Sequence, residues 1–191
     1  MFLLHFKPDD HIEVDGKAYR VDSSFDKVLK LIDLLKETQI SDNNKLKIGI
    51  QMLFGANVDL LELEMKDLAK VFNATFEKIV NLTESKPEKL DRLGNVIPEY
   101  KKDEENYYSL SHDAEYIFSS FFQAYGIDLI EEQGKLSWDK FQALLAGLPE
   151  NTKFKEVVSI RAWKKPSKND SEAKRMAKLQ EIYKLPSEGV E

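Results

Sequence analysis

The chain has 191 residues, of which 42% are hydrophobic and 32% are charged; these values exclude an intrinsically disordered chain and allow one medium domain or two small ones. The absence of cysteine excludes disulfides, thiolate metal sites and cysteine nucleophiles. The net charge is −9 for residues 1–160 and +3 for residues 161–191, and the acidic body disfavours nucleic acid as the main partner because phosphate binding needs clustered cations.

A β-hairpin is predicted near the N-terminus. Apolar residues alternate on both sides of Asp15-Gly16, a pair that favours a two-residue turn because both turn positions need positive φ. In that register Ile12 faces Tyr19. The apolar residues 1–6 indicate a further short strand.

Three helices are predicted next. Ser23 and Asp26 have the spacing of a capping box, and an apolar stripe with helical period follows them. A second helix begins near Asp42 and ends at Gly55 as a left-handed C-cap. Helical period then continues over residues 58–82, which predicts one long helix.

Composition changes in residues 84–107, which hold two prolines, a glycine and many charges and are typical of a linker. Beyond it, Ser111, Ser137 and Thr152 each precede an apolar periodic segment and are predicted to begin three further helices, the first of which ends at Gly126. Residues 173–183 in the polar tail favour a basic amphipathic helix.

The predicted fold class is therefore mainly α with a small N-terminal β-hairpin, in two helical subregions joined by a polar linker. The predicted regions are 1–83 (hairpin plus helices), 84–107 (linker), 108–163 (C-terminal helical region) and 164–191 (a basic tail with freedom to move).

The acidic loop at residues 128–139 surrounds a glycine and raises the question of a calcium site. An EF-hand loop needs oxygen ligands at positions 1, 3, 5 and 12 and glycine at position 6. With Asp128 at position 1, Gly134 falls at position 7. With Gly134 at position 6, Lys140 takes the place of the bidentate carboxylate. We therefore interpret the loop as a connector and predict no metal site.

Catalytic motifs are absent from the sequence. The histidines are His5, His11 and His112, and no third zinc ligand accompanies the first two. The chain contains no nucleophile elbow, phosphate-binding glycine loop or H-E-x-x-H motif. The Glu104-Glu105 pair lies in a polar stretch, a poor setting for a general acid. We predict no catalytic residue, no cofactor and no enzymatic activity.

Aromatic residues are the richer signal. Six of them lie within residues 118–141: Phe118, Phe121, Phe122, Tyr125, Trp138 and Phe141. We interpret most of them as a small core where two helices meet. The face formed by the first four is wide, which indicates an open edge that serves as a groove for a partner helix. Phe121 and Phe122 point about 100° apart, and the sequence does not say which one faces the core.

The basic tail supplies the other candidate partner-binding residues. These are Arg161, Lys164 and Lys165, which are candidates for contact with an acidic partner. A solvated face is the alternative interpretation of the same residues.

The segments "DAEYIFSSFFQAYGIDL" and "LSWDKFQALLAGLPENTKFKEVVSIR" are similar to the "gene product fifteen" family of bacteriophages that infect Gram-positive bacteria. The points of contact include the loop at residues 125–129, Trp138 and Phe141. The first half resembles the family more loosely, in its hairpin and in "SSFDKVLKLIDLL". The resemblance covers most of residues 12–163.

This resemblance implies a tail assembly chaperone of a siphophage or prophage, because family members are encoded between the major tail protein and the tape measure. Such a protein is non-enzymatic, keeps the tape-measure protein soluble during tail tube assembly and is absent from the mature virion. Self-association stays open. The alternatives are a structural tail or virion component and a nucleic-acid-binding regulator that uses the basic tail.

A location in the cytoplasm of the bacterial host is expected. No apolar run approaches the roughly 20 residues of a membrane-spanning helix. The apolar stretch at the start of the chain also lacks the basic flank of a signal peptide. We therefore expect no membrane partner.

Overall fold

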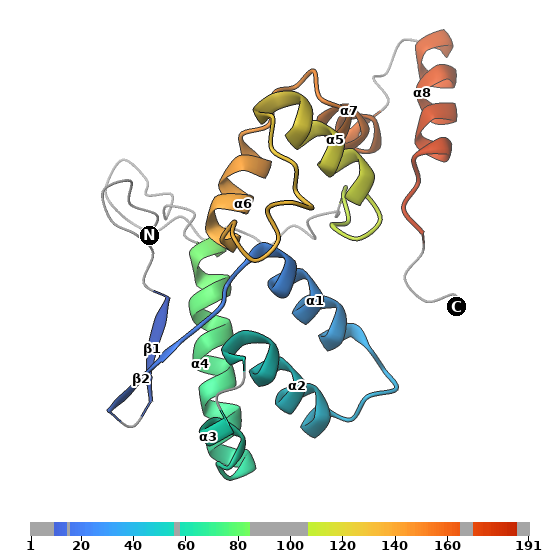
Figure 1. Ribbon diagram of the computed structural model, residues 1–191. Coiled ribbons are helices and arrows are strands. Elements are labelled where there is room, and N and C mark those ends of the chain that lie inside the picture. The colour runs from blue at the N-terminus through green and yellow to red at the C-terminus, as the bar shows by residue number, and fades with distance from the viewer. Residues whose placement is uncertain (1–9, 15, 56–57, 85–106, 165–169, 187–191) are drawn as a thin grey trace, which may run out of the picture. The chain divides into compact units, whose positions relative to one another are not determined.

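The computed structural model describes residues 10–14, 16–55, 58–84, 107–164 and 170–186. These residues are mainly helical, with one two-stranded antiparallel hairpin near the N-terminus, which confirms the predicted fold class (Figure 1). The chain divides into two compact units. Unit 1 comprises Met1–Ile97 and Glu132–Ala143, and unit 2 comprises Pro98–Glu131 and Leu144–Glu191.

This division differs from the predicted regions in two respects. The prediction kept residues 108–163 together, whereas the structure assigns 132–143 to unit 1. Residues 164–191, predicted as a separate basic tail, belong to unit 2. Most of the predicted linker at 84–107 lies outside the described residues.

The hairpin consists of β1 (His11–Val14) and β2 (Lys17–Arg20). Ile12 pairs with Tyr19, as predicted. Gly16 has a φ of 77°, a conformation that glycine adopts without steric cost in such a turn. The predicted strand at residues 1–6 lies outside the described residues.

Four helices complete most of unit 1: α1 (Phe25–Lys36), α2 (Asp42–Phe54), α3 (Val58–Leu61) and α4 (Met65–Glu84). Their apolar stripes supply its core, with α1 packed on α2 and α2 on α4. The most deeply buried side chains are those of Leu31, Ile50, Leu53, Leu60 and Leu68. The hairpin is tied to this core because Tyr19 meets the edge of Phe54, with ring centroids 6.4 Å apart.

The predicted capping box at the start of α1 is wrong. The N-cap is Ser24, and it makes no side-chain capping bond. Asp26, the other half of the proposed box, accepts a hydrogen bond at 2.8 Å from the backbone N–H of Gly134 instead. A contact from a distant segment has therefore replaced the local one. The end of α2 is also only partly as predicted, because Gly55 has positive φ (66°) but a ψ of −141°, outside the left-handed helical region.

The single helix predicted for residues 58–82 is broken. Helix α3 ends at Leu61, and α4 begins at Met65. The first turn of α4 is closed by the Glu64 carbonyl, which accepts hydrogen bonds from the N–H groups of Asp67 and Leu68. No proline or glycine marks the break. Leu60 in α3 and Leu68 in α4 are both fully buried, so both helices contribute to the core of unit 1.

Residues 132–143 join unit 1 by pairing with the start of α1. The Phe25 N–H donates to the Leu136 carbonyl at 3.0 Å, and the Trp138 N–H donates to the Ser23 carbonyl at 2.8 Å. Phe25 then stacks on Phe141, with centroids 5.0 Å apart. Most of the six aromatics in residues 118–141 were predicted to share one small core, but the two aromatics of α6 (Trp138–Ala146) pack in unit 1 and the other four lie in unit 2.

Unit 2 is built on α5 (Ala114–Tyr125), α7 (Lys153–Ala162) and α8 (Asp170–Ile182). Helix α7 packs on both α5 and α8. Gly126 ends α5 in the left-handed conformation and Thr152 is the N-cap of α7, as predicted. The N-cap of α5 is Asp113 and not the predicted Ser111. Helix α8 confirms the helix predicted within the tail.

Gly49 gives the first testable prediction. A Cβ at this position would lie 2.6 Å from Cε2 of Phe72 and 3.1 Å from Cδ1 of Leu31. Alanine has a helix propensity better than glycine by about 1 kcal/mol, but overpacking a core costs about 1–3 kcal/mol. We expect Gly49→Ala to lower the free energy of unfolding in urea. The exposed Asn43→Ala on the same helix is the control, and an equal or higher stability of the glycine variant would contradict the packing.

A second prediction concerns Trp138, which is 4% exposed and stacks on Phe141 at 5.5 Å. Trp138→Ala removes a buried ring, a change that costs about 3–5 kcal/mol. We expect the melting temperature to fall, with the loss of structure in unit 1. Lys140→Ala on the exposed side of α6 serves as the control. An unchanged melting temperature would place the Trp138 ring outside the core.

Candidate partner-binding surface

A buried ion pair holds unit 2 together. Arg161, in the last turn of α7, donates from Nη1 to Oδ2 of Asp113 at 2.6 Å and from Nη2 to Oδ1 at 2.8 Å. The side chains of Arg161 and Asp113 are 10% and 1% exposed. This two-pronged geometry is the strongest form of a charged hydrogen bond between side chains. Because Asp113 is the N-cap of α5, the pair fixes the start of α5 to the end of α7.

The same guanidinium also reaches two backbone carbonyls. Nη1 donates to the Tyr107 carbonyl at 3.0 Å, and Nε donates to the Tyr183 carbonyl at 2.5 Å. Gln180 reinforces the second contact, since its amide donates to the carbonyls of Ile160 and Trp163 at the end of α7. Arg161 therefore anchors α8 as well as α5. Its predicted role as a partner-binding cation is corrected to a structural one, because all three nitrogens donate within unit 2.

Helix α5 presents two different faces. Phe121 is fully buried, together with Ile117 and Ser120, whose hydroxyl accepts a hydrogen bond at 3.0 Å from the N–H of Phe154. Phe122 is 58% exposed. The structure thus assigns Phe121 to the core and Phe122 to the surface, a choice that the sequence left open.

The other two candidate aromatics lie between these extremes. Phe118 is half-buried and lies one turn before Phe122 on the same side of α5. Tyr125 is also half-buried, and its hydroxyl donates to the Leu144 carbonyl at 2.9 Å while its ring meets Phe121 edge-on. We define the α5 outer face as Glu115, Phe118, Ser119 and Phe122.

Exposed apolar side chains concentrate in unit 2. Among the described residues, the large exposed hydrophobics are Ile48, Tyr108, Phe122, Ile130 and Ile182, and only the first belongs to unit 1. Residues 107–131 contain no lysine or arginine. The segment that carries α5 is therefore apolar and acidic, and the described cations of unit 2 come from α7, α8 and the residues that follow these two helices.

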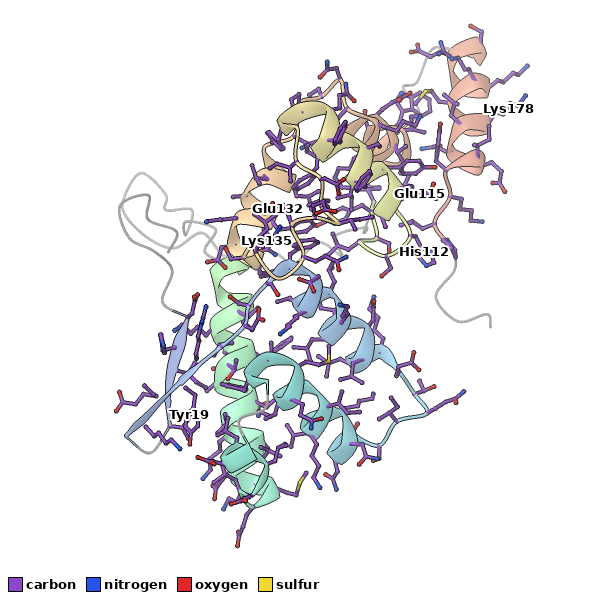
Figure 2. All side chains as sticks on the ribbon, viewed as in Figure 1. Tyr19, His112, Glu115, Glu132, Lys135 and Lys178 are labelled. Atoms are coloured by element: carbon purple, nitrogen blue, oxygen red, sulfur yellow. The ribbon has the colours of Figure 1, made fainter. Side chains whose placement is uncertain are left out.

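The basic candidates lie elsewhere. Lys164 follows α7 and is exposed, and Lys165 lies outside the described residues. Lys174, Arg175 and Lys178, which belong to the predicted basic tail, are exposed on α8. Figure 2 shows Lys178 pointing away from the remainder of unit 2.

The acidic loop after α5 is organised by its own backbone. Oδ1 of Asp128 accepts hydrogen bonds from the N–H groups of Ile130 at 2.9 Å and Glu131 at 3.3 Å. Such an Asx turn uses the carboxylate that the calcium hypothesis would have made a ligand. In the part of the chain that the structure describes, no three His, Cys, Asp or Glu side chains are grouped to hold a metal ion.

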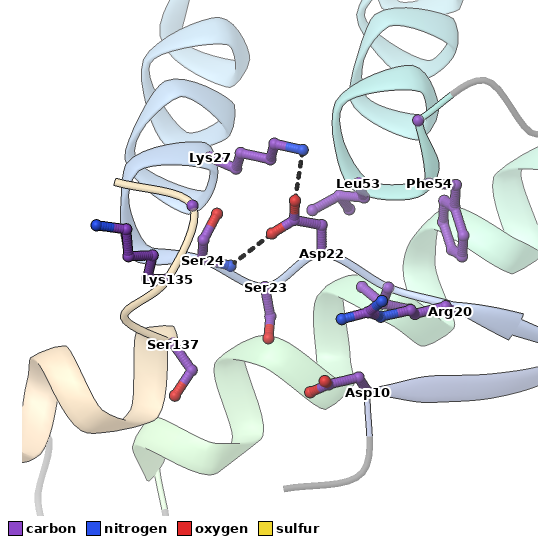
Figure 3. Close-up of a pocket in the computed structure, with 13 residues that line it drawn as sticks. Asp10, Arg20, Asp22, Ser23, Ser24, Lys27, Leu53, Phe54, Lys135 and Ser137 are labelled. Atoms are coloured by element: carbon purple, nitrogen blue, oxygen red, sulfur yellow. Dashed lines mark hydrogen bonds and ion pairs between the residues drawn. The ribbon is translucent and has the colours of Figure 1, made fainter. Parts of the chain in front are cut away.

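Unit 1 contains a polar pocket of about 360 Å³ where the chain passes from β2 into α1 (Figure 3). Asp22 lies in it and accepts hydrogen bonds from Nζ of Lys27 at 2.5 Å and from the Ser24 N–H at 3.1 Å. Burial raises the pKa of Asp22, but the hydrogen bonds from Lys27 and Ser24 outweigh it, so the pKa lies below its usual value. An ionised, paired carboxylate is a poor proton donor at neutral pH. We interpret the pocket as the polar junction that orients α1.

Among the helices in the described ranges, none is both long enough and apolar enough to cross a bilayer.

The model of the bacteriophage Gp15 protein family matches residues 8–185 of the chain. The chain belongs to this family. The match extends over both units. It confirms the family that the second half of the sequence indicated, and it also covers the first half, where the resemblance is looser. No curated protein and no solved structure matches the chain.

Within this member of the Gp15 family, the sequence reading missed Asp113 as the partner of Arg161. The two residues are 48 positions apart. An aspartate at a helix start and an arginine at a helix end are ordinary features of isolated helices, so no local signal marks the pair.

The pair gives a third prediction. Arg161→Met leaves Asp113 buried and unpaired, and breaking a buried pair in this way costs about 3–5 kcal/mol. Asp113→Leu leaves the Arg161 guanidinium without its carboxylate partner in the same way. We expect the double variant to be more stable in urea unfolding than either single variant, because it leaves no unpaired buried charge.

The control for this double-mutant cycle is Lys174→Met, which removes an exposed cation and should change stability by less than about 0.5 kcal/mol. Simple additivity of the Arg161 and Asp113 losses would show that the two side chains act independently.

Proposed function

We propose that this chain is a tail assembly chaperone that binds the tape-measure protein and keeps it soluble while the tail tube assembles. The observation that carries the proposal is an exposed aromatic side chain, Phe122, on the helix of a protein that belongs to a phage family. An apolar surface of this kind is typical of a site for another protein. The proposal includes a non-enzymatic role in the host cytoplasm and absence from the mature virion.

The mode of binding that fits the α5 outer face is helix against helix. Phe118 and Phe122 are four residues apart and form a ridge along α5. A partner helix with apolar residues at the same spacing would pack against this ridge. The exposed Glu115 at one end of this face favours partner segments that carry lysine or arginine beside their apolar stripe.

The face is held in place before any partner arrives. The ion pair between Asp113 and Arg161 anchors the start of α5, and the bond from Tyr125 to the Leu144 carbonyl anchors its end. A preorganised helix loses little conformational entropy on binding, which favours association through a small apolar contact. Such a contact also releases readily, as a chaperone requires.

The test compares two neighbouring phenylalanines. Phe122→Glu should retain the circular dichroism spectrum and the melting temperature of the parent, but it should lose most capture of the co-expressed tape-measure protein. Phe121→Glu places a charge in the core and should unfold unit 2. Ile48→Glu, which changes an exposed apolar residue of unit 1, is the control and should capture the tape measure normally. Normal capture by Phe122→Glu would place the binding surface elsewhere.

Two further measurements separate this function from its alternatives. Because the contact is mainly apolar, 0.5 M salt, with a screening length of ~4 Å, should weaken the complex without abolishing it. Mass spectrometry of purified virions should not detect the chain. Its presence at stoichiometric levels would favour a structural tail component instead.

A further inference from the structure

Helix α8 carries an exposed stripe that none of its own packing uses. Arg175, Lys178 and Ile182 are exposed, and Ile182 is 63% exposed. The opposite side of α8 makes the contacts within unit 2, through the buried Ala173 and through Gln180. We define the α8 stripe as Arg175, Lys178 and Ile182.

The α8 stripe and the α5 outer face have the same spacing. Glu115, Phe118 and Phe122 follow steps of three and four residues, as do the three residues of the α8 stripe. The first and last residues of each set are seven positions apart, which is nearly two turns and about 10 Å along the helix. Each helix therefore presents a charged residue and an exposed apolar residue in one line along its axis. Within the described chain, Glu115, Arg175 and Lys178 make no ion pair.

The two lines are complementary when the helices run parallel. Glu115 then faces Arg175, the Phe118 ring faces the aliphatic stem and ammonium of Lys178, and Phe122 faces Ile182. These contacts are an ion pair, a cation–π contact and an apolar contact. In the antiparallel register Phe122 would still have a cation, Arg175, opposite its ring. Glu115 would face Ile182, however, so the ion pair and the apolar contact would both be lost.

The two lines do not meet within one copy. The C-terminal end of α8 lies beside the start of its own α5, where the rings of Tyr183 and Tyr116 meet edge-on at 6.1 Å. The α8 stripe is on the other side of the helix, and Lys178 projects from it away from α5 and α7 (Figure 2). The complement of each line must therefore come from another molecule.

We propose that this molecule is a second copy of the chain, with the α8 stripe of each copy packed on the α5 outer face of the other. Both surfaces belong to unit 2, so one twofold axis generates the contact twice. The contact involves about two turns of each helix and is small compared with stable interfaces, so the dimer is reversible and depends on concentration. It covers Phe122 when no other partner is bound. This self-association goes beyond the proposed function and does not rest on it.

The experiment measures the mass of the full chain, without any tape-measure protein, by analytical ultracentrifugation over a range of concentrations. The parent should show a monomer–dimer equilibrium. Glu115→Lys and Arg175→Glu should each raise the dimer dissociation constant about tenfold, because each changes two symmetric ion pairs into repulsions. The double variant restores both attractions with the charges exchanged, and it should return to within about threefold of the parent.

The matched control is Glu150→Lys, the same charge change at an exposed position of unit 2 before α7, which should leave the dissociation constant unchanged. Ile182→Glu should weaken the dimer without a change in the circular dichroism spectrum. A chain that stays monomeric at its highest soluble concentration would overturn the proposal, as would a double variant as weak as the single ones. Since no tape-measure protein is present, such a failure leaves the proposed function untouched. If the parent chain dimerises but does not capture the tape-measure protein, the proposed function fails and the dimer stands.

Discussion

Unit 2 depends on the ion pair between Arg161 and Asp113. The guanidinium holds the first residue before α5, the end of α7 and the turn after α8 in one hydrogen-bonded group. A buried ion pair contributes little net free energy compared with apolar residues of the same shape, but it tolerates few alternative arrangements, because any other register leaves a buried charge unpaired. Its main effect is therefore to define one packing of the helices, and the exposed aromatic of α5 acquires a defined position as a result.

Most secondary structure could be read from local pattern. The hairpin register followed from alternation and one Asp-Gly pair, and the left-handed end of α5 from Gly126. The errors arose where a distant segment competes with a local signal. Asp26 accepts a hydrogen bond from the Gly134 N–H and does not cap its own helix. This contact joins residues 108 positions apart, so it is not visible in the sequence of α1 alone.

The candidate surface was predictable as a region and not as individual residues. Helical spacing placed Phe121 and Phe122 about 100° apart, but the choice between them depends on which side α7 covers. Ser120 shows that side, because its buried hydroxyl accepts the Phe154 N–H. Arg161 was misread for a related reason: an arginine in a basic tail looks solvated until its partner 48 residues earlier is known. Exposure of Ile182 likewise required knowledge of which side of α8 packs.

The return of residues 132–143 to unit 1 has a consequence for synthesis on the ribosome. Phe25 emerges early, but Phe141, on which it stacks, is made more than a hundred residues later. Domains that are contiguous in sequence can fold as soon as they leave the exit tunnel. Unit 1 cannot complete its core in this way, since part of that core is translated after the first part of unit 2. The nascent chain therefore carries an incomplete apolar core in unit 1 until residues 132–143 have left the exit tunnel.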